Sequence, residues 1–263
     1  MDSLSFDNMT DLYGETRSFD VGCFSLSLDY LCEQFPPCAF PRLLEPGIGS
    51  GRIAFPLAER GYRVTGVDIS RAMLSLLERR KRESVRPLEI ESHLGDATAL
   101  PFADEAFDLC VAAHLFYFIR DWPKAACEMV RVTRGGGAII LMHTGTGMEI
   151  PFLNDRYKEL CAKKGCPIPT VGAESTQQVV DYLAQLGYCG ETIRDRWNWV
   201  ARVRLDKALG HLRSRAYSFT TFASQSVHAE AVETLLAEIE GTHGGLSAEI
   251  DVPNRISLVV FRK

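Results

Sequence analysis

The chain has 263 residues, of which 46% are hydrophobic and 24% are charged, and its formal net charge is −5. This composition is that of an ordinary globular protein and excludes disordered and fibrous classes. An acidic balance also disfavours nucleic acid as the main partner, because phosphate binding requires a basic surface. The basic run from Arg79 to Arg82 fits the carboxyl end of a helix, with a nucleic-acid contact as the alternative.

The sequence shows no targeting or membrane-spanning pattern. Its first residues lack a basic stretch followed by an apolar one, and no run reaches the ~18 apolar residues of a membrane span. We therefore expect a cytoplasmic protein. Its eight cysteines form no Cys-x-x-Cys pair, which predicts free thiols and no metal site. A soft metalloid such as arsenic, bound through Cys161 and Cys166, is the alternative, although no larger cysteine cluster accompanies these two residues.

Residues 1–41 form a lead-in to the first predicted strand. Their apolar residues recur at near-helical spacing before Pro36 and Pro37, which predicts an amphipathic helix closed by prolines. The apolar positions are Phe19, Val21, Phe24, Leu28, Leu31 and Phe35.

A glycine-rich loop then follows a short apolar run, residues 42–44. Glycine stands at every second position (Gly47, Gly49 and Gly51), and helical periodicity resumes at residue 53, so the pattern predicts strand, tight loop and helix. A dinucleotide fingerprint requires a glycine where this chain has Arg52. Glu45 also places negative charge where phosphates would lie. The loop therefore favours a ligand that carries positive charge.

Strands and helices alternate from here to residue 143, as they do in α/β domains. Asp68 ends the second predicted strand, Ser70 can cap the helix after it, and Asp121 with Pro123 begins another helix. The predicted strands cover residues 62–67, 88–93, 107–113 and 138–142.

Three motifs in this region resemble those of class I S-adenosylmethionine-dependent methyltransferases. They are Glu45-x-Gly47-x-Gly49-x-Gly51, Asp68 at the end of the next strand, and Gly95-Asp96-Ala97 after the third. The resemblance covers residues 43–143. It implies a Rossmann-like, mostly parallel seven-stranded sheet with one antiparallel strand and helices on both faces, and S-adenosyl-L-methionine across the carboxyl ends of the strands.

The remainder of the chain has a looser pattern. Residues 144–186 are predicted as an insertion with a short helix near 155–162, followed by a helix that Ser175 caps. Residues 187–263 contain the last two strands, 192–203 and 249–261. The resemblance implies that the strand 249–261 pairs beside Trp197, which lies in the strand 192–203. Two helices, 205–217 and 228–240, interrupt that hairpin, and we predict that residues 205–243 form a small helical substrate cap.

The resemblance also implies roles for the cofactor-binding residues. Glu45 supports the methionyl amino group, the three loop glycines allow close approach of the backbone, and Asp68 accepts the ribose hydroxyls. A charged strand end is the alternative for Glu45.

Further along the chain, Ile69 is expected on the adenine face, Asp96 at the adenine amine and the Ala97 N–H at a ring nitrogen. An Asx-turn is the alternative for Asp96. Tyr13 is a candidate lid residue in the lead-in, and His114 follows the fourth strand beside the expected sulfonium.

Methyl transfer is predicted to be an in-line displacement that depends on alignment and on exclusion of water, and therefore does not require a catalytic residue. If the acceptor is a hydroxyl or a protonated amine, a base helps, and the candidates by location are His114, Tyr117 and His143, with His211 ranked below them. Aromatic residues around the expected cleft favour an aromatic or apolar acceptor, or else fill the core. They are Phe116, Tyr117, Phe118, Trp197, Trp199, Tyr217 and Phe219.

Three functions remain open from the sequence. The first is methyl transfer to a small molecule. The second is binding of S-adenosylmethionine without methyl transfer, as in a pericyclase or a sensor. The third, a nicotinamide-dependent oxidoreductase, is disfavoured by Arg52 and Glu45. The acceptor, the methylated atom and the oligomeric state are not determined by the sequence.

Overall fold

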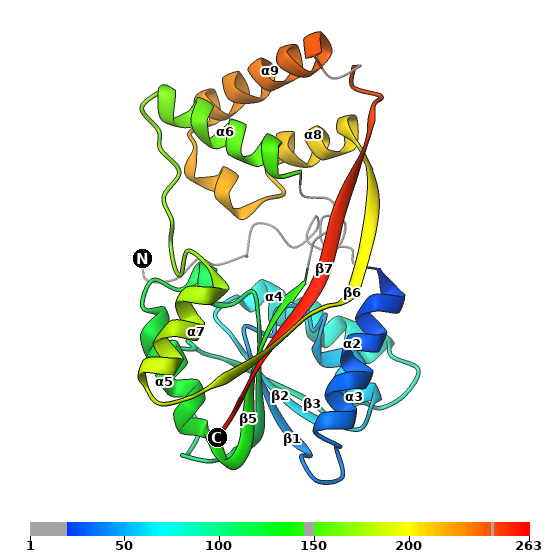
Figure 1. Cartoon of the computed structure of the whole chain (residues 1–263), viewed down its shortest axis with the longest axis vertical. Helices are drawn as coiled ribbons and strands as arrows, with labels where there is room; N and C mark the ends of the chain where they lie inside the picture. Colours follow the sequence, from blue (N-terminus) through cyan, green and yellow to red (C-terminus); the bar gives the residue numbers. More distant parts are fainter. Residues whose placement is uncertain (1–19, 145–149, 243–244) are drawn as a thin grey trace.

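The computed structural model describes residues 20–144, 150–242 and 245–263 (Figure 1). Tyr13 lies outside the described residues. A seven-stranded sheet organises the chain, in the order β3-β2-β1-β4-β5-β7-β6. Its strands are β1 Arg42–Pro46, β2 Arg63–Asp68, β3 Ile90–Leu94, β4 Phe107–Ala113, β5 Thr133–Thr144, β6 Gly190–Arg204 and β7 Glu249–Arg262.

The sheet confirms the predicted Rossmann-like architecture. Strands β1 to β5 pair in parallel, and β7 runs antiparallel to both of its neighbours, β5 and β6. Trp197 on β6 lies opposite Ile256 on β7, which is the pairing that the resemblance implied. Strand β4 is buried along almost its whole length, as an unbroken apolar run requires when both faces of a sheet are covered.

Helices cover both faces of this sheet. One face carries α2 Val21–Gln34, α3 Ala54–Glu59 and α4 Arg71–Glu83, which share a hydrophobic cluster with alternate strand residues such as Leu43 and Leu109. The other face carries α5 Trp122–Val132 and α7 Thr176–Gln185, packed on Leu44 and Cys110. Successive residues along each strand therefore face opposite clusters, because side chains in a strand alternate between the two faces of the sheet.

Two of the three residues predicted to cap the start of a helix, Ser70, Ser175 and Asp121, form the capping hydrogen bond. The hydroxyl oxygens of Ser70 and Ser175 accept hydrogen bonds from the backbone of residues 73 and 178, as predicted. Asp121 occupies the cap position of α5, but its side chain makes no capping hydrogen bond.

A third hydrophobic cluster lies in a separate helical layer, which we call the cap. It contains α6 Pro151–Lys163, α8 Leu205–Arg213 and α9 Gln225–Thr242, with the short 3₁₀ turn η2 Ser218–Phe222 (Figure 1). The long strands β6 and β7 extend beyond the sheet to reach it, so that Val203 and Val252 belong to the cap cluster. Helix α6 starts at Pro151, four residues before the predicted start, because proline is well tolerated in the first turn of a helix.

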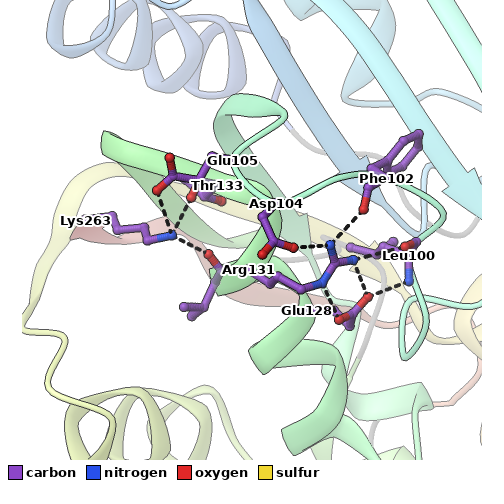
Figure 2. A network of polar contacts seen from close by, with 9 residues as sticks. Leu100, Phe102, Asp104, Glu105, Glu128, Arg131, Thr133 and Lys263 are labelled. Atoms are coloured by element: carbon purple, nitrogen blue, oxygen red, sulfur yellow. Dashed lines mark hydrogen bonds and ion pairs between the residues drawn. The ribbon is translucent and has the colours of Figure 1, made fainter.

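Arg131 on α5 fixes the loop that joins β3 to β4 (Figure 2). Its guanidinium donates to the backbone carbonyls of Leu100 and Phe102 and to the carboxylates of Asp104 and Glu128. Glu128 in turn accepts from the Leu100 N–H at 2.7 Å. The loop follows directly after Asp96 and Ala97, so this network holds one wall of the site described next.

Candidate functional site

A cavity opens at the carboxyl ends of β1, β2 and β4. Its wall contains eight of the predicted site residues: Glu45, Gly47, Gly49, Asp68, Ile69, Asp96, Ala97 and His114. Gly51 is not part of this wall, and a Cβ there would lie 2.7 Å from the Phe55 ring. Gly51 therefore allows close packing of α3.

The glycine loop has the backbone conformation that its sequence predicts. Gly47, Gly49 and Gly51 have φ angles of 73°, 53° and 79°, in the left-handed region that favours glycine. A Cβ on Gly47 would lie 2.7 Å from the Leu115 side chain, which also lines the cavity. The Gly47 N–H donates to the Val67 carbonyl at 2.7 Å and so fastens the loop to β2.

Glu45 is a buried carboxyl group at the end of β1. Only 3% of the residue is exposed, and its Oε2 has no hydrogen-bond partner. Burial raises the pKa of Glu45 well above its usual range; Asp68 raises it further, whereas Arg52 and the Ala54 N–H lower it. A buried, unpartnered acidic oxygen in a cavity wall fits a positively charged ligand group.

The two aspartates at the cavity are held by backbone groups. Asp68 Oδ2 accepts from the Gly49 N–H and Oδ1 accepts from the Ser70 N–H, both at 2.8 Å. Each carboxylate oxygen can accept a second hydrogen bond. Asp96 Oδ1 accepts from the Thr98 N–H at 2.8 Å, which is the Asx-turn geometry, and the residue also lines the cavity.

His114 has a φ of 54°, which is uncommon outside glycine and asparagine. Its Nε2 accepts from the Thr144 N–H at 3.0 Å and lies 2.8 Å from the Thr144 hydroxyl. Because the backbone N–H can only donate, Nε2 carries the lone pair and the ring hydrogen lies on Nδ1. Arg52 reaches the same hydroxyl at 3.5 Å.

The three candidate bases come together at a second, smaller cavity, which shares His114 and Leu115 with the first. The His143 ring lies 4.7 Å from that of His114 and 6.5 Å from that of Tyr117, between centroids. Burial lowers the pKa of His143, and Arg255 lowers it further. His211 lies on α8 of the cap and lines neither cavity.

The predicted aromatic residues divide between the two cavities and the hydrophobic clusters. Phe118 lines the larger cavity, whereas Phe116 and Tyr117 line the smaller one. Trp197 packs against Tyr30 in the sheet core, and Tyr217 belongs to the cap cluster. Trp197 and Tyr217 therefore follow the alternative expected from the sequence, that some of these rings fill the core.

Sequence reasoning missed Arg52 and Thr144 as site residues. In the sequence, Arg52 was interpreted only as a departure from the dinucleotide pattern. Its position in the glycine loop could have indicated a role at the site. Thr144 is the last residue of β5. Its position at the carboxyl edge of a parallel sheet, where ligands bind, could have indicated a role at the site. Within residues 20–144, 150–242 and 245–263, no group of three or more histidine, cysteine or acidic side chains is arranged to hold a metal ion.

Comparison with known proteins places this arrangement in a family. Residues 44–141 match the methyltransferase domain family, and this stretch includes the glycine loop, Asp68 and Asp96. The core is a class I methyltransferase domain. The match confirms the resemblance seen in the sequence and S-adenosyl-L-methionine as the cofactor that belongs to this class.

Two relatives of the methyltransferase domain are demethylmenaquinone methyltransferases. The one from Renibacterium salmoninarum is 32% identical over 168 residues, 62% of this chain and 65% of the relative. The one from Thermus thermophilus is 40% identical over 136 residues, 50% of this chain and 59% of the relative. The chain thus spans less than two thirds of either relative.

Among solved structures, the [4+2]-cyclase SpnF has the same fold as the methyltransferase domain and its extensions. Its TM-score is 0.62 at 18% identity, and the likeness covers 98% of this chain and 93% of SpnF. A likeness at this identity concerns the fold alone. Among the described residues, none of the helices has the length and apolar composition to cross a membrane.

Proposed function

We propose that the protein is an S-adenosyl-L-methionine-dependent methyltransferase that transfers a methyl group to a small-molecule acceptor by in-line displacement. The observation that carries this proposal is Glu45, a buried acid with an unpartnered oxygen in the wall of the glycine-loop cavity. A nucleotide phosphate would be repelled there, whereas an ammonium group beside a sulfonium complements the charge.

The residues of the cavity are assigned roles on this basis. Glu45 would accept from the methionyl amino group, and Asp68, whose carboxylate is oriented by the Gly49 and Ser70 N–H groups, would accept from the ribose hydroxyls. Asp96 and the Ala97 N–H would face the adenine, with Ile69 against its ring. The bound cofactor supplies a methyl group activated by its sulfonium. The chain orients the acceptor and excludes water.

The smaller cavity is the proposed acceptor site, because it adjoins the cofactor cavity through His114 and Leu115. Most of its wall is apolar or aromatic, which fits an aromatic or apolar small molecule. Both relatives described above are named for demethylmenaquinone, which supports a small-molecule acceptor. We place the reaction in the cytoplasm, in small-molecule metabolism.

Calorimetric titration of S-adenosyl-L-methionine and, separately, of NAD into the protein tests the cofactor half. We expect the protein to bind S-adenosyl-L-methionine and not NAD, and we expect Asp68→Ala to lose affinity for S-adenosyl-L-methionine. Asp181→Ala, on the surface of α7, is the matched control and should bind as the parent does. Binding of NAD alone would refute the assignment.

A non-transferring protein of the same fold is the second candidate, and the likeness to the [4+2]-cyclase SpnF supports it. Incubation with S-adenosyl-L-methionine and a panel of small-molecule acceptors separates the two. Release of S-adenosylhomocysteine that depends on an acceptor establishes methyl transfer. Tight cofactor binding without such release across the panel favours the second candidate.

A further inference from the structure

The smaller cavity has apolar walls with a few polar groups between them. Ala112 and Leu141 come from the sheet and Val179 from α7, and the rings of Phe116 and Tyr117 close one side. The polar side chains in the wall are His114, Tyr117, His143, Ser175 and Thr176. A ligand here therefore buries an apolar body and must match the polar groups that remain available.

Most of these polar groups already have partners inside the chain. Tyr117 Oη and Thr176 Oγ1 lie 2.8 Å apart and satisfy each other. Ser175 Oγ accepts from the Gln178 N–H, and His114 Nε2 accepts from the Thr144 N–H. In the described part of this wall, His143 Nδ1 is the buried side-chain atom left without a hydrogen-bond partner.

The surroundings of His143 favour its neutral form. Burial lowers its pKa, and the positive charge of Arg255 on β7 lowers it further. Among the residues that the structure describes, His114 after β4, Tyr117 on η1 and Arg255 on β7 are the titratable or charged groups near it, and no carboxylate lines this part of the cavity wall. A neutral imidazole can accept a proton near neutral pH.

We propose that His143 binds and deprotonates a hydroxyl group on an apolar acceptor that enters the smaller cavity. This inference rests on the proposed methyl transfer. In the tautomer with hydrogen on Nε2, the Nδ1 lone pair accepts the hydroxyl hydrogen bond. As the oxygen forms its bond to the methyl carbon, the bond from carbon to sulfur breaks and its electron pair goes to sulfur. The hydroxyl proton moves to Nδ1, and the imidazolium later releases it to solvent.

The other two candidate bases are less suited to this step. The lone pair of His114 Nε2 is directed at a backbone N–H, which fixes the ring but occupies its basic nitrogen. The Tyr117 hydroxyl is engaged with the Thr176 hydroxyl at 2.8 Å. We assign positioning roles to both: His114 holds β4 to β5, and Tyr117 holds η1 to α7.

The test compares two probes, 1-naphthol and 1-methylnaphthalene, in which a methyl group of similar size replaces the hydroxyl. Both are titrated into the protein saturated with S-adenosylhomocysteine. We expect 1-naphthol to bind about three- to tenfold more tightly, the range of one net hydrogen bond. His143→Phe should abolish this preference. His93→Phe, a partly exposed histidine on β3 paired with Glu91, is the matched control and should retain it.

A second variant separates binding from proton transfer. His143→Gln can still form a hydrogen bond but cannot take the proton, so it should keep part of the preference and lose turnover of 1-naphthol. In the parent, kcat/KM for 1-naphthol should rise as the pH increases through the lowered pKa of His143. In His143→Gln, this rise in kcat/KM with pH should be absent.

Unchanged affinity for S-adenosylhomocysteine shows that each variant is folded. If S-adenosylhomocysteine fails to bind the parent, the proposed function itself is wrong. If it binds but 1-naphthol does not, or if His143→Phe keeps the preference for 1-naphthol, the assignment of His143 is overturned while methyl transfer stands.

Discussion

The methyltransferase core and the cap differ in what their polar groups do. In the core, Glu45 and His143 each have a buried polar atom without a partner, and both residues line cavities. In the cap, Tyr157 Oη lies 2.8 Å from His228 Nδ1, and His228 Nε2 lies 3.2 Å from the Arg213 carbonyl. Arg215 Nη2, also in the cap, is buried without a hydrogen-bond partner, but Arg215 lines neither cavity. An unpartnered buried group therefore indicates a candidate ligand site only where its residue also lines a cavity, as Glu45 and His143 do.

The largest expected effect comes from truncating one buried leucine in each region. Leu57→Ala in α3 and Leu212→Ala in α8 should each cost about 3 kcal/mol of unfolding free energy, because both side chains are at most 1% exposed. Urea denaturation measures the loss. Only Leu57→Ala should also weaken cofactor binding, because α3 follows the glycine loop. Loss of cofactor binding in Leu212→Ala would show that the cap and the core are one energetic unit.

Glu45→Gln should weaken S-adenosyl-L-methionine binding by roughly ten- to a hundredfold, the value of a charge-assisted hydrogen bond. Glu238→Gln in the cap is the control and should bind normally. Binding to the parent should also release a proton, because the cationic ligand favours the ionised form of Glu45. Calorimetry in buffers of different ionisation enthalpy detects this release, and its absence would mean that Glu45 is already ionised.

Glu45→Gln, which should weaken cofactor binding, should increase the stability of the ligand-free protein at higher pH. Burial raises the pKa of Glu45 in the folded state, so its contribution is fully favourable below the unfolded pKa and is lost as pH rises through the folded one. Glutamine does not ionise. The ligand-free variant should therefore gain stability relative to the parent as pH increases, which thermal unfolding across pH would show.

Arg131→Met should destabilise the protein by roughly 1–2 kcal/mol, because it leaves two backbone carbonyls of the β3–β4 loop without their donor. Hydrogen exchange should accelerate in residues 98–106, and cofactor affinity should fall a few-fold. The matched cap variant is Arg156→Met, whose partners are the carboxylates of Glu159 and Glu238. It should cost less stability and leave cofactor affinity unchanged, and equal effects would remove the contrast between the regions.

The smallest effect is expected where the two regions are alike. Tyr62 in the core donates to the Phe35 carbonyl at 2.5 Å, and Tyr157 in the cap is bonded to His228. Tyr62→Phe and Tyr157→Phe should each cost about 1 kcal/mol, one net hydrogen bond, and neither should change cofactor affinity. Differential scanning calorimetry of both variants checks this, and a change in affinity in either would show that its hydroxyl group supports the site.

The sequence by itself determined the core. The glycine spacing, Glu45 before it and Asp68 after the next strand are local patterns, since each depends on residues adjacent in the chain and on strand ends that parallel pairing brings to one edge. Through the family resemblance that they carry, these patterns predicted the fold class, the position of the cavity and eight residues of its wall. Helix α8 begins at Leu205 as predicted, whereas α6 and α9 begin four and three residues before their predicted starts, because helix ends depend on local competition among caps and turns.

Only the tertiary structure decided which polar groups have partners. Thr144, thirty residues after His114, directs its N–H at that ring, and Thr176 engages Tyr117, so His143 is left with the unpartnered nitrogen. The same holds for the aromatic residues, of which Trp197 and Tyr217 proved to be packing residues. Partnership and burial are set by contacts between segments far apart in the chain, and no local pattern in the sequence records them.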